Sequence, residues 1–114
     1  MTDCLFCKII AAKIPTKKVY EDDKAFAFED INPQAPTHVL IVPKRHIETL
    51  NALEPGDDQL IGELARRAAA IARERGISEK GYRAVFNTNP EAGQTVFHIH
   101  LHVLGGRAMR WPPG

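Results

Sequence analysis

The sequence has no long hydrophobic run and no excess of charge of either sign, and it contains only two cysteines. No segment approaches the roughly 18 apolar residues of a membrane span, and the N-terminus has no basic stretch followed by an apolar one. We therefore expect a cytoplasmic protein without a membrane partner. Fifteen Lys plus Arg against fourteen Asp plus Glu give a formal charge of +1, which argues against a nucleic-acid partner.

Internal repeats, low-complexity stretches and Gly/Ser linkers are also absent. The 114 residues, 44% of them apolar and 25% charged, are therefore predicted to form a single domain spanning residues 1–114. A domain of this size buries roughly two-thirds of its unfolded surface, so neither disulfides nor a metal are required for folding.

Hydrophobic periodicity predicts two helices and five strands. Helical spacing of apolar residues predicts a short helix over residues 4–12 and a longer one that begins near Asp57 and Asp58 and ends before Gly76. Alternating or β-branched runs predict strands over residues 17–21, 24–29, 38–42, 82–87 and 96–104. Since the connections are short, we expect an α+β fold with a five-stranded antiparallel sheet.

Three of the five histidines fall in the last predicted strand, at His98, His100 and His102. Alternate residues of a strand share a face, so the three imidazoles are predicted to line one face and the intervening apolar residues the other. An ordinary solvent-exposed strand does not explain three histidines on one face, since Thr, Lys or Glu at these positions would give better solubility.

Two functional interpretations of this histidine strand remain. In the first, all three imidazoles bind one metal, but alternate Cα atoms are about 6.5 to 7 Å apart, which strains a three-ligand site on a single strand. In the second, His100 is a nucleophile, since a neutral imidazole attacks phosphorus and its neighbours bind the phosphate. Uncharged donors for phosphate oxygens are available nearby, from Asn87, Gln94 and Thr95 and from the backbone of residues 92–95.

The two cysteines, Cys4 and Cys7, form a C-x-x-C pair. In an intracellular chain this spacing indicates metal binding or redox chemistry more readily than a structural disulfide. No βαβ pattern precedes Cys4, which argues against a thioredoxin-like redox motif.

The segment from His98 to Leu104 resembles the histidine triad of the HIT superfamily of nucleotide hydrolases and transferases, in which three histidines alternate with apolar residues. Further segments, which together with the triad cover nearly the whole chain, are similar to the Hint branch of that superfamily: residues 21–23, 28–31, 33–38, 41–44, 93–97 and 104–114. The C-terminal segment distinguishes this branch from the dinucleoside-polyphosphate hydrolases.

The resemblance implies a homodimer whose two sheets join into one of ten strands, and a purine nucleoside phosphoramidase activity. His100 would attack the α-phosphorus of an adenosine 5′-phosphoramidate, leaving an adenylylated histidine that water hydrolyses. His102 would bind the phosphate and His38 would relay protons. Thr95 stands where the family usually has Ser near the leaving group.

The same resemblance implies how the purine nucleotide is held, without an organic cofactor. Asp30 would accept hydrogen bonds from the ribose hydroxyls, as a carboxylate beside a diol does. The base would lie in an apolar pocket formed by Phe6, Ile14, Phe28, Ile31 and Leu40. The remaining expected contacts are Asn87 and the Gly93–Thr95 backbone, including Gln94, at the phosphate, and Trp111 near the partner subunit's site.

The C-x-x-C pair is similar to that of zinc-bearing members of the superfamily. In those proteins the pair joins two histidines, whose counterparts here are His46 and His98. Two thiolates and two imidazoles make a closed tetrahedral set, so the implied zinc is structural. His98 then serves the metal, and the other two triad histidines remain free for phosphate chemistry.

Two other functions are compatible with these residues. The first is a regulatory or interaction module that binds AMP with little turnover. The second is a zinc-dependent hydrolase with an open metal site, whose activity a chelator would remove at once. The sequence does not identify the amine that leaves or the preferred purine.

Overall fold

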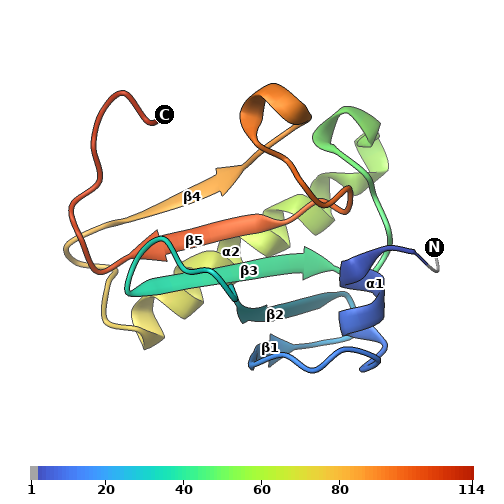
Figure 1. Cartoon of the computed structure of the whole chain (residues 1–114), viewed down its shortest axis with the longest axis horizontal. Helices are drawn as coiled ribbons and strands as arrows, with labels where there is room; N and C mark the ends of the chain where they lie inside the picture. Colours follow the sequence, from blue (N-terminus) through green and yellow to red (C-terminus); the bar gives the residue numbers. More distant parts are fainter. Residues whose placement is uncertain (1–2) are drawn as a thin grey trace.

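The fold is one antiparallel sheet with a helix on each face, as Figure 1 shows for a computed structural model that describes residues 3–114. The strands are β1 (Lys18–Glu21), β2 (Ala25–Glu29), β3 (Thr37–Pro43), β4 (Tyr82–Phe86) and β5 (Leu101–Gly105), and the α-helices are α1 (Leu5–Ile10) and α2 (Asp58–Glu74). Their order across the sheet is β1-β2-β3-β5-β4, and every neighbouring pair is antiparallel. The predicted α+β fold and five-stranded sheet are confirmed.

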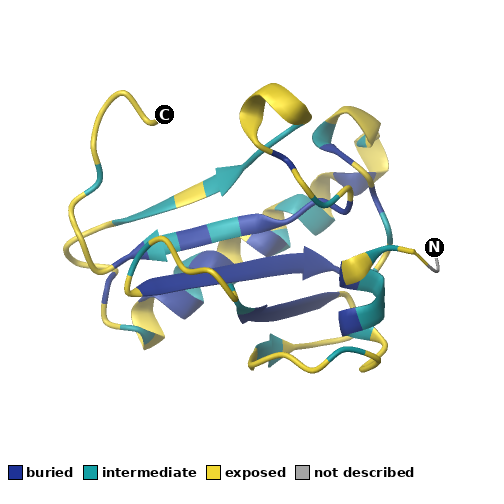
Figure 2. Cartoon of the chain, viewed as in Figure 1, coloured by how far each residue is buried: buried dark blue, intermediate teal, exposed yellow. Residues whose placement is uncertain are grey.

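Helix α2 covers one face of the sheet. Its apolar side packs on alternate residues of the three central strands, and Val39, Ile41 and Val103 of that cluster are fully buried. Figure 2 shows β3 buried along its whole length, which agrees with its uninterrupted apolar run. Among residues 3–114 no helix has both the length and the apolar composition of a membrane span.

Helix α1 lies on the opposite face, at the end of the sheet where β3 finishes (Figure 1). Phe6 and Ile9 of α1 pack there against Phe26, Phe28 and Leu40. Leu40 pairs in register with His102 of β5, and strand residues alternate between faces. His38 and His102 therefore lie on the α1 face, away from α2.

The last strand is shorter than predicted: it begins at Leu101 and not at residue 96. The pairing register sets Ile41 opposite Leu101, and β3 ends two residues later at Pro43, which has no backbone N–H to donate. The Pro43 carbonyl is also occupied, since it lies 2.7 Å from Nε2 of His98. Residues 96–100 therefore lie outside the sheet, and the expectation that one regular strand carries all three triad histidines is wrong.

Candidate active site and metal centre

His38 and His102 are joined by a hydrogen bond that determines where their protons lie. The backbone N–H of Gln34 donates to Nδ1 of His38 over 3.0 Å, so a neutral His38 carries its proton on Nε2. That Nε2 lies 2.9 Å from Nδ1 of His102, which must therefore accept. The proton of His102 is consequently on its own Nε2.

Nε2 of His102 is a buried donor without a hydrogen-bond partner in the part of the chain that the structure describes. A buried N–H of this kind costs free energy unless a ligand accepts its hydrogen bond. Burial, followed by the nearby His100 and His38, lowers the pKa of His102 to about 4. His102 is therefore neutral near pH 7 and presents an uncharged donor.

Asp30 lies beside this pair of histidines. Its Oδ2 is 3.4 Å from Nε2 of His38, and its Oδ1 accepts a 2.8 Å hydrogen bond from the backbone N–H of Asn32. Burial lowers the pKa of His38, and the Asp30 carboxylate opposes that effect. Asp30 is only partly buried, so its carboxylate also faces the surface.

The ring of His100 is held in one tautomer by the backbone. Its Nδ1 lies 2.8 Å from the carbonyl oxygen of His98, and a carbonyl can only accept, so the proton is on Nδ1. Nε2 therefore carries a free lone pair. Burial lowers the pKa of His100 and keeps the imidazole neutral. The ring centroids of His100 and His102 are 4.9 Å apart, which places a nucleophilic nitrogen near an unpaired donor.

The predicted base-pocket residues divide into two groups. Phe6, Phe28 and Leu40 are at most 5% exposed and form one apolar cluster, with Ile14 packed against it. Ile31, by contrast, is 99% exposed. It lines a surface hollow together with Asp30 and residues whose role the sequence did not indicate: Pro15, Thr16, Lys17, Glu29, Pro33 and Pro36.

The loop before the triad is held by the amide of Gln94. Its Nε2 donates to the carbonyls of Glu48 and Val96, over 2.8 and 3.1 Å, and its Oε1 accepts from the N–H of Asn89. This buried side chain is therefore committed to the protein, and the expected contact of Gln94 with phosphate has no free amide donor.

The other predicted phosphate contacts lie on this loop or just before it. Gly93 has a positive φ of 89°, and Thr95 is exposed in a hollow that also includes Cys4 and His46. Asn87 is half-buried just after β4. Trp111 is 83% exposed in the C-terminal segment, which continues beyond β5 (Figure 1).

The four predicted metal ligands meet at the N-terminal end of α1. Nδ1 of His98 lies 3.3 Å from Sγ of Cys4 and 3.6 Å from Sγ of Cys7. Nδ1 of His46 lies 3.5 Å from Sγ of Cys7 and 3.2 Å from Nδ1 of His98. All four ligand atoms lie within 4.8 Å of one another.

These separations fit a tetrahedral ion. Zn–S and Zn–N bonds of about 2.3 and 2.05 Å place two nitrogens about 3.3 Å apart, a nitrogen and a sulfur about 3.6 Å apart, and two sulfurs about 3.8 Å apart. His98 is also prepared as a ligand, because its Nε2 donates to the Pro43 carbonyl and leaves Nδ1 unprotonated. Cys4 and Cys7 are free thiols that flank Phe6. The four residues, called here the metal knot, can therefore hold zinc, and four protein ligands leave no open position for water.

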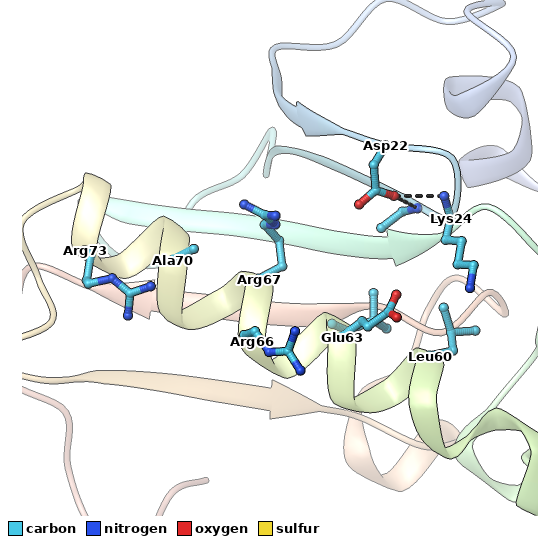
Figure 3. Close-up of a pocket in the computed structure, with 10 residues that line it drawn as sticks. Asp22, Lys24, Leu60, Glu63, Arg66, Arg67, Ala70 and Arg73 are labelled. Carbon is cyan, nitrogen blue, oxygen red and sulfur yellow. Dashed lines mark hydrogen bonds between the residues drawn. The ribbon is translucent and has the colours of Figure 1, made fainter.

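A separate hollow lies between α2 and the β1–β2 turn (Figure 3). Asp22 there accepts from the backbone N–H groups of Lys24 and Ala25, each over 2.8 Å. The lining mixes acidic and basic side chains and contains no histidine or cysteine. It borders the α2 core through Ala25 and Leu64, on the other side of the sheet from the catalytic candidates.

The sheet thus carries His102 on β5 beside His38 of β3, and His100 lies just before β5. The chain belongs to the HIT family, since the HIT domain model matches residues 11–109. The resemblance found in the sequence is thereby confirmed at the level of the family.

Individual relatives match nearly the whole chain. A purine nucleoside phosphoramidase of Escherichia coli (strain K12) is 49% identical over 107 residues, which are 94% of this chain and 90% of that protein. A HIT-like protein of Synechocystis is 51% identical over 112 residues, or 98% and 97% of the two chains. The crystal structure of a HIT family hydrolase from Legionella pneumophila superposes with a TM-score of 0.97 at 54% identity, covering 98% and 100%.

Proposed function

We propose that this protein is a purine nucleoside phosphoramidase, which hydrolyses the P–N bond of adenosine 5′-phosphoramidates. The observation that carries the proposal is the pair of ring nitrogens described above. Nε2 of His100 has a free lone pair, and Nε2 of His102 is a buried N–H without a partner among residues 3–114. A nucleophile next to an unused donor suits attack on a phosphorus atom whose oxygen accepts that donor's hydrogen bond.

In the first step Nε2 of His100 attacks the α-phosphorus, a new N–P bond forms, and the P–N bond to the amine breaks. The amine leaves with the electron pair of that bond and takes up a proton from solvent water, beside the Thr95 hydroxyl. The imidazole becomes cationic because it keeps its Nδ1 proton, and the His98 carbonyl, 2.8 Å away, stabilises this charge. The His102 N–H donates to a phosphate oxygen throughout.

In the second step water attacks the phosphorus of the adenylylated His100. The N–P bond breaks, AMP leaves, the attacking water gives up one proton to solvent, and His100 returns to its neutral form. His38 supports this step by holding the His102 tautomer, because its Nε2–H donates to Nδ1 of His102 over 2.9 Å.

The nucleoside extends from this phosphate toward the hollow that Asp30 and Ile31 line. Asp30 accepts hydrogen bonds from the ribose, while its carboxylate stays beside His38. The base contacts Ile31 and Ile14, with the buried cluster of Phe6, Phe28 and Leu40 beneath. Asn87 and the backbone N–H of Thr95 face the phosphate, since the N–H groups of Gly93 and Gln94 donate to carbonyls of the same loop. Zinc in the metal knot would have a structural role and would tether α1 to the sheet.

The function is tested with purified protein and a fluorogenic adenosine phosphoramidate. We expect turnover with release of the amine and AMP, and AMP binding in calorimetry. AMP binding without measurable turnover would contradict the proposal and indicate a nucleotide-binding module instead. Immediate loss of activity with a chelator, before any loss of folded protein, would indicate an open metal site.

We also propose that the protein is a homodimer with a continuous ten-stranded sheet. The sheet has two edge strands, β1 and β4, and the C-terminal segment continues past the sheet with Trp111 83% exposed. A large aromatic side chain left exposed fits contact with a partner subunit's site. Light scattering should give twice the 12.7 kDa mass of the chain, and Trp111→Ala should change the preference among amines. A monomeric mass would contradict the dimer.

A further inference from the structure

The nucleophile of the proposed reaction is not held by the sheet. β5 begins at Leu101, so His100 and the four residues before it lie outside the ladder of strand hydrogen bonds. An irregular segment needs other contacts if it is to hold a reactive ring in one orientation.

The contacts that hold this segment lead to the metal knot. Nε2 of His98 donates to the Pro43 carbonyl over 2.7 Å, and the N–H of Ile99 donates to the carbonyl of Ile47, also over 2.7 Å. Ile47 directly follows the ligand His46. The carbonyl of His98, a ligand through its side chain, accepts the Nδ1 proton of His100. One residue thus supplies a side chain to the knot and a backbone acceptor to the nucleophile.

Phe6 connects the knot to the nucleophile by a second route. It lies between Cys4 and Cys7 on α1, and its ring meets that of His100 edge to face, with the centroids 4.9 Å apart and an interplanar angle of 87°. The centroid of the Phe6 ring also lies 5.5 Å from that of Phe28. Because the two flanking cysteines are ligands, metal binding fixes the segment that carries Phe6.

We propose that the metal knot positions His100 for catalysis, through the His98 peptide and the Phe6 ring. An occupied knot holds His100 in the tautomer with its proton on Nδ1, and Nε2 then faces the substrate. This inference rests on the proposed function, because it gives the knot a role in that reaction in addition to tethering α1. Phe6 is accordingly a positioning residue rather than one that touches the phosphate.

The first test compares zinc-loaded protein with protein depleted by a chelator. Long-range proton–nitrogen NMR spectra of the histidine rings report each tautomer directly. We expect a single Nδ1–H form of His100 with zinc, a mixture of tautomers without it, and recovery when zinc chloride is returned. An unchanged Nδ1–H form in the depleted, folded protein would overturn the proposal. This readout does not require turnover, so it is separate from the test of the function.

The second test keeps the metal in place and changes only the packing, in case depletion unfolds the chain. Phe6→Leu should retain zinc but lower kcat about tenfold, a larger effect than any change in KM or AMP affinity, since an ill-placed nucleophile slows the chemical step. Phe26→Leu is the matched control, because Phe26 belongs to the same apolar cluster and its ring centroid lies 6.1 Å from that of Phe28. Equal kcat values for the two variants would overturn the role of Phe6.

Discussion

Replacing His100 with glycine should abolish turnover of an adenosine phosphoramidate, with kcat falling by about 10³-fold or more. The variant removes the ring whose Nε2 lone pair is proposed to attack phosphorus, whereas the other proposed phosphate and ribose contacts remain. AMP affinity measured by calorimetry should therefore change by only about threefold, or less than 1 kcal/mol. Added imidazole should restore part of the activity by supplying the missing nucleophile.

Arg73→Ala is a suitable control for this experiment. Arg73 belongs to α2 and lines the hollow of Figure 3. This hollow lies on the opposite side of the sheet from His100, so removal of the Arg73 side chain should leave kcat unchanged. Full activity of His100→Gly would eliminate the proposed mechanism. A similar loss of activity in both variants would point to a general effect on folding.

Replacing Cys4 with alanine should remove zinc from the protein and lower its stability. Wild-type protein should contain about one zinc per chain by elemental analysis, and the variant less than about a tenth of that, since two imidazoles and one thiolate bind far more weakly. Binding free energy at such a site is also folding free energy, so we expect the free energy of unfolding to fall by about 3 kcal/mol or more.

Lys8→Ala tests whether the loss is specific to the metal. Lys8 lies in the same short helix and its side chain is not a ligand, so this variant should keep its zinc and its stability. Absence of zinc from the wild-type protein, across preparations with zinc in the medium, would reduce the knot to a packed pair of thiols and imidazoles.

Periodicity was sufficient to predict the fold class and most of the helices and strands. The apolar spacing around Leu64, Ala68 and Ile71 identified α2, and these three residues are at most 2% exposed. The β-branched run from Val39 to Val42 identified the central strand. α2 buries one face and β3 buries both, and the positions of the apolar residues in the sequence indicate such burial directly.

Alternation failed at the histidine triad for a physical reason. The pattern from His98 to His102 satisfies a strand, but strand pairing also needs a partner, and β3 ends at Pro43. Single-chain periodicity contains no information about where a neighbouring strand stops. The sequence also gave no indication that the backbone of Gln34 sets the tautomer of His38, since a main-chain donor has no residue type to recognise.

Burial keeps both His100 and His102 uncharged near pH 7, so the proposed phosphate site offers neutral imidazoles instead of fixed cations. Neutral donors hold a phosphate group less tightly than lysine or arginine does. In the proposed mechanism, attack converts the His100 ring to a cation, so attraction to the phosphate strengthens only as the reaction proceeds. Such a site stabilises the reacting state more than it stabilises AMP, which favours rapid product release.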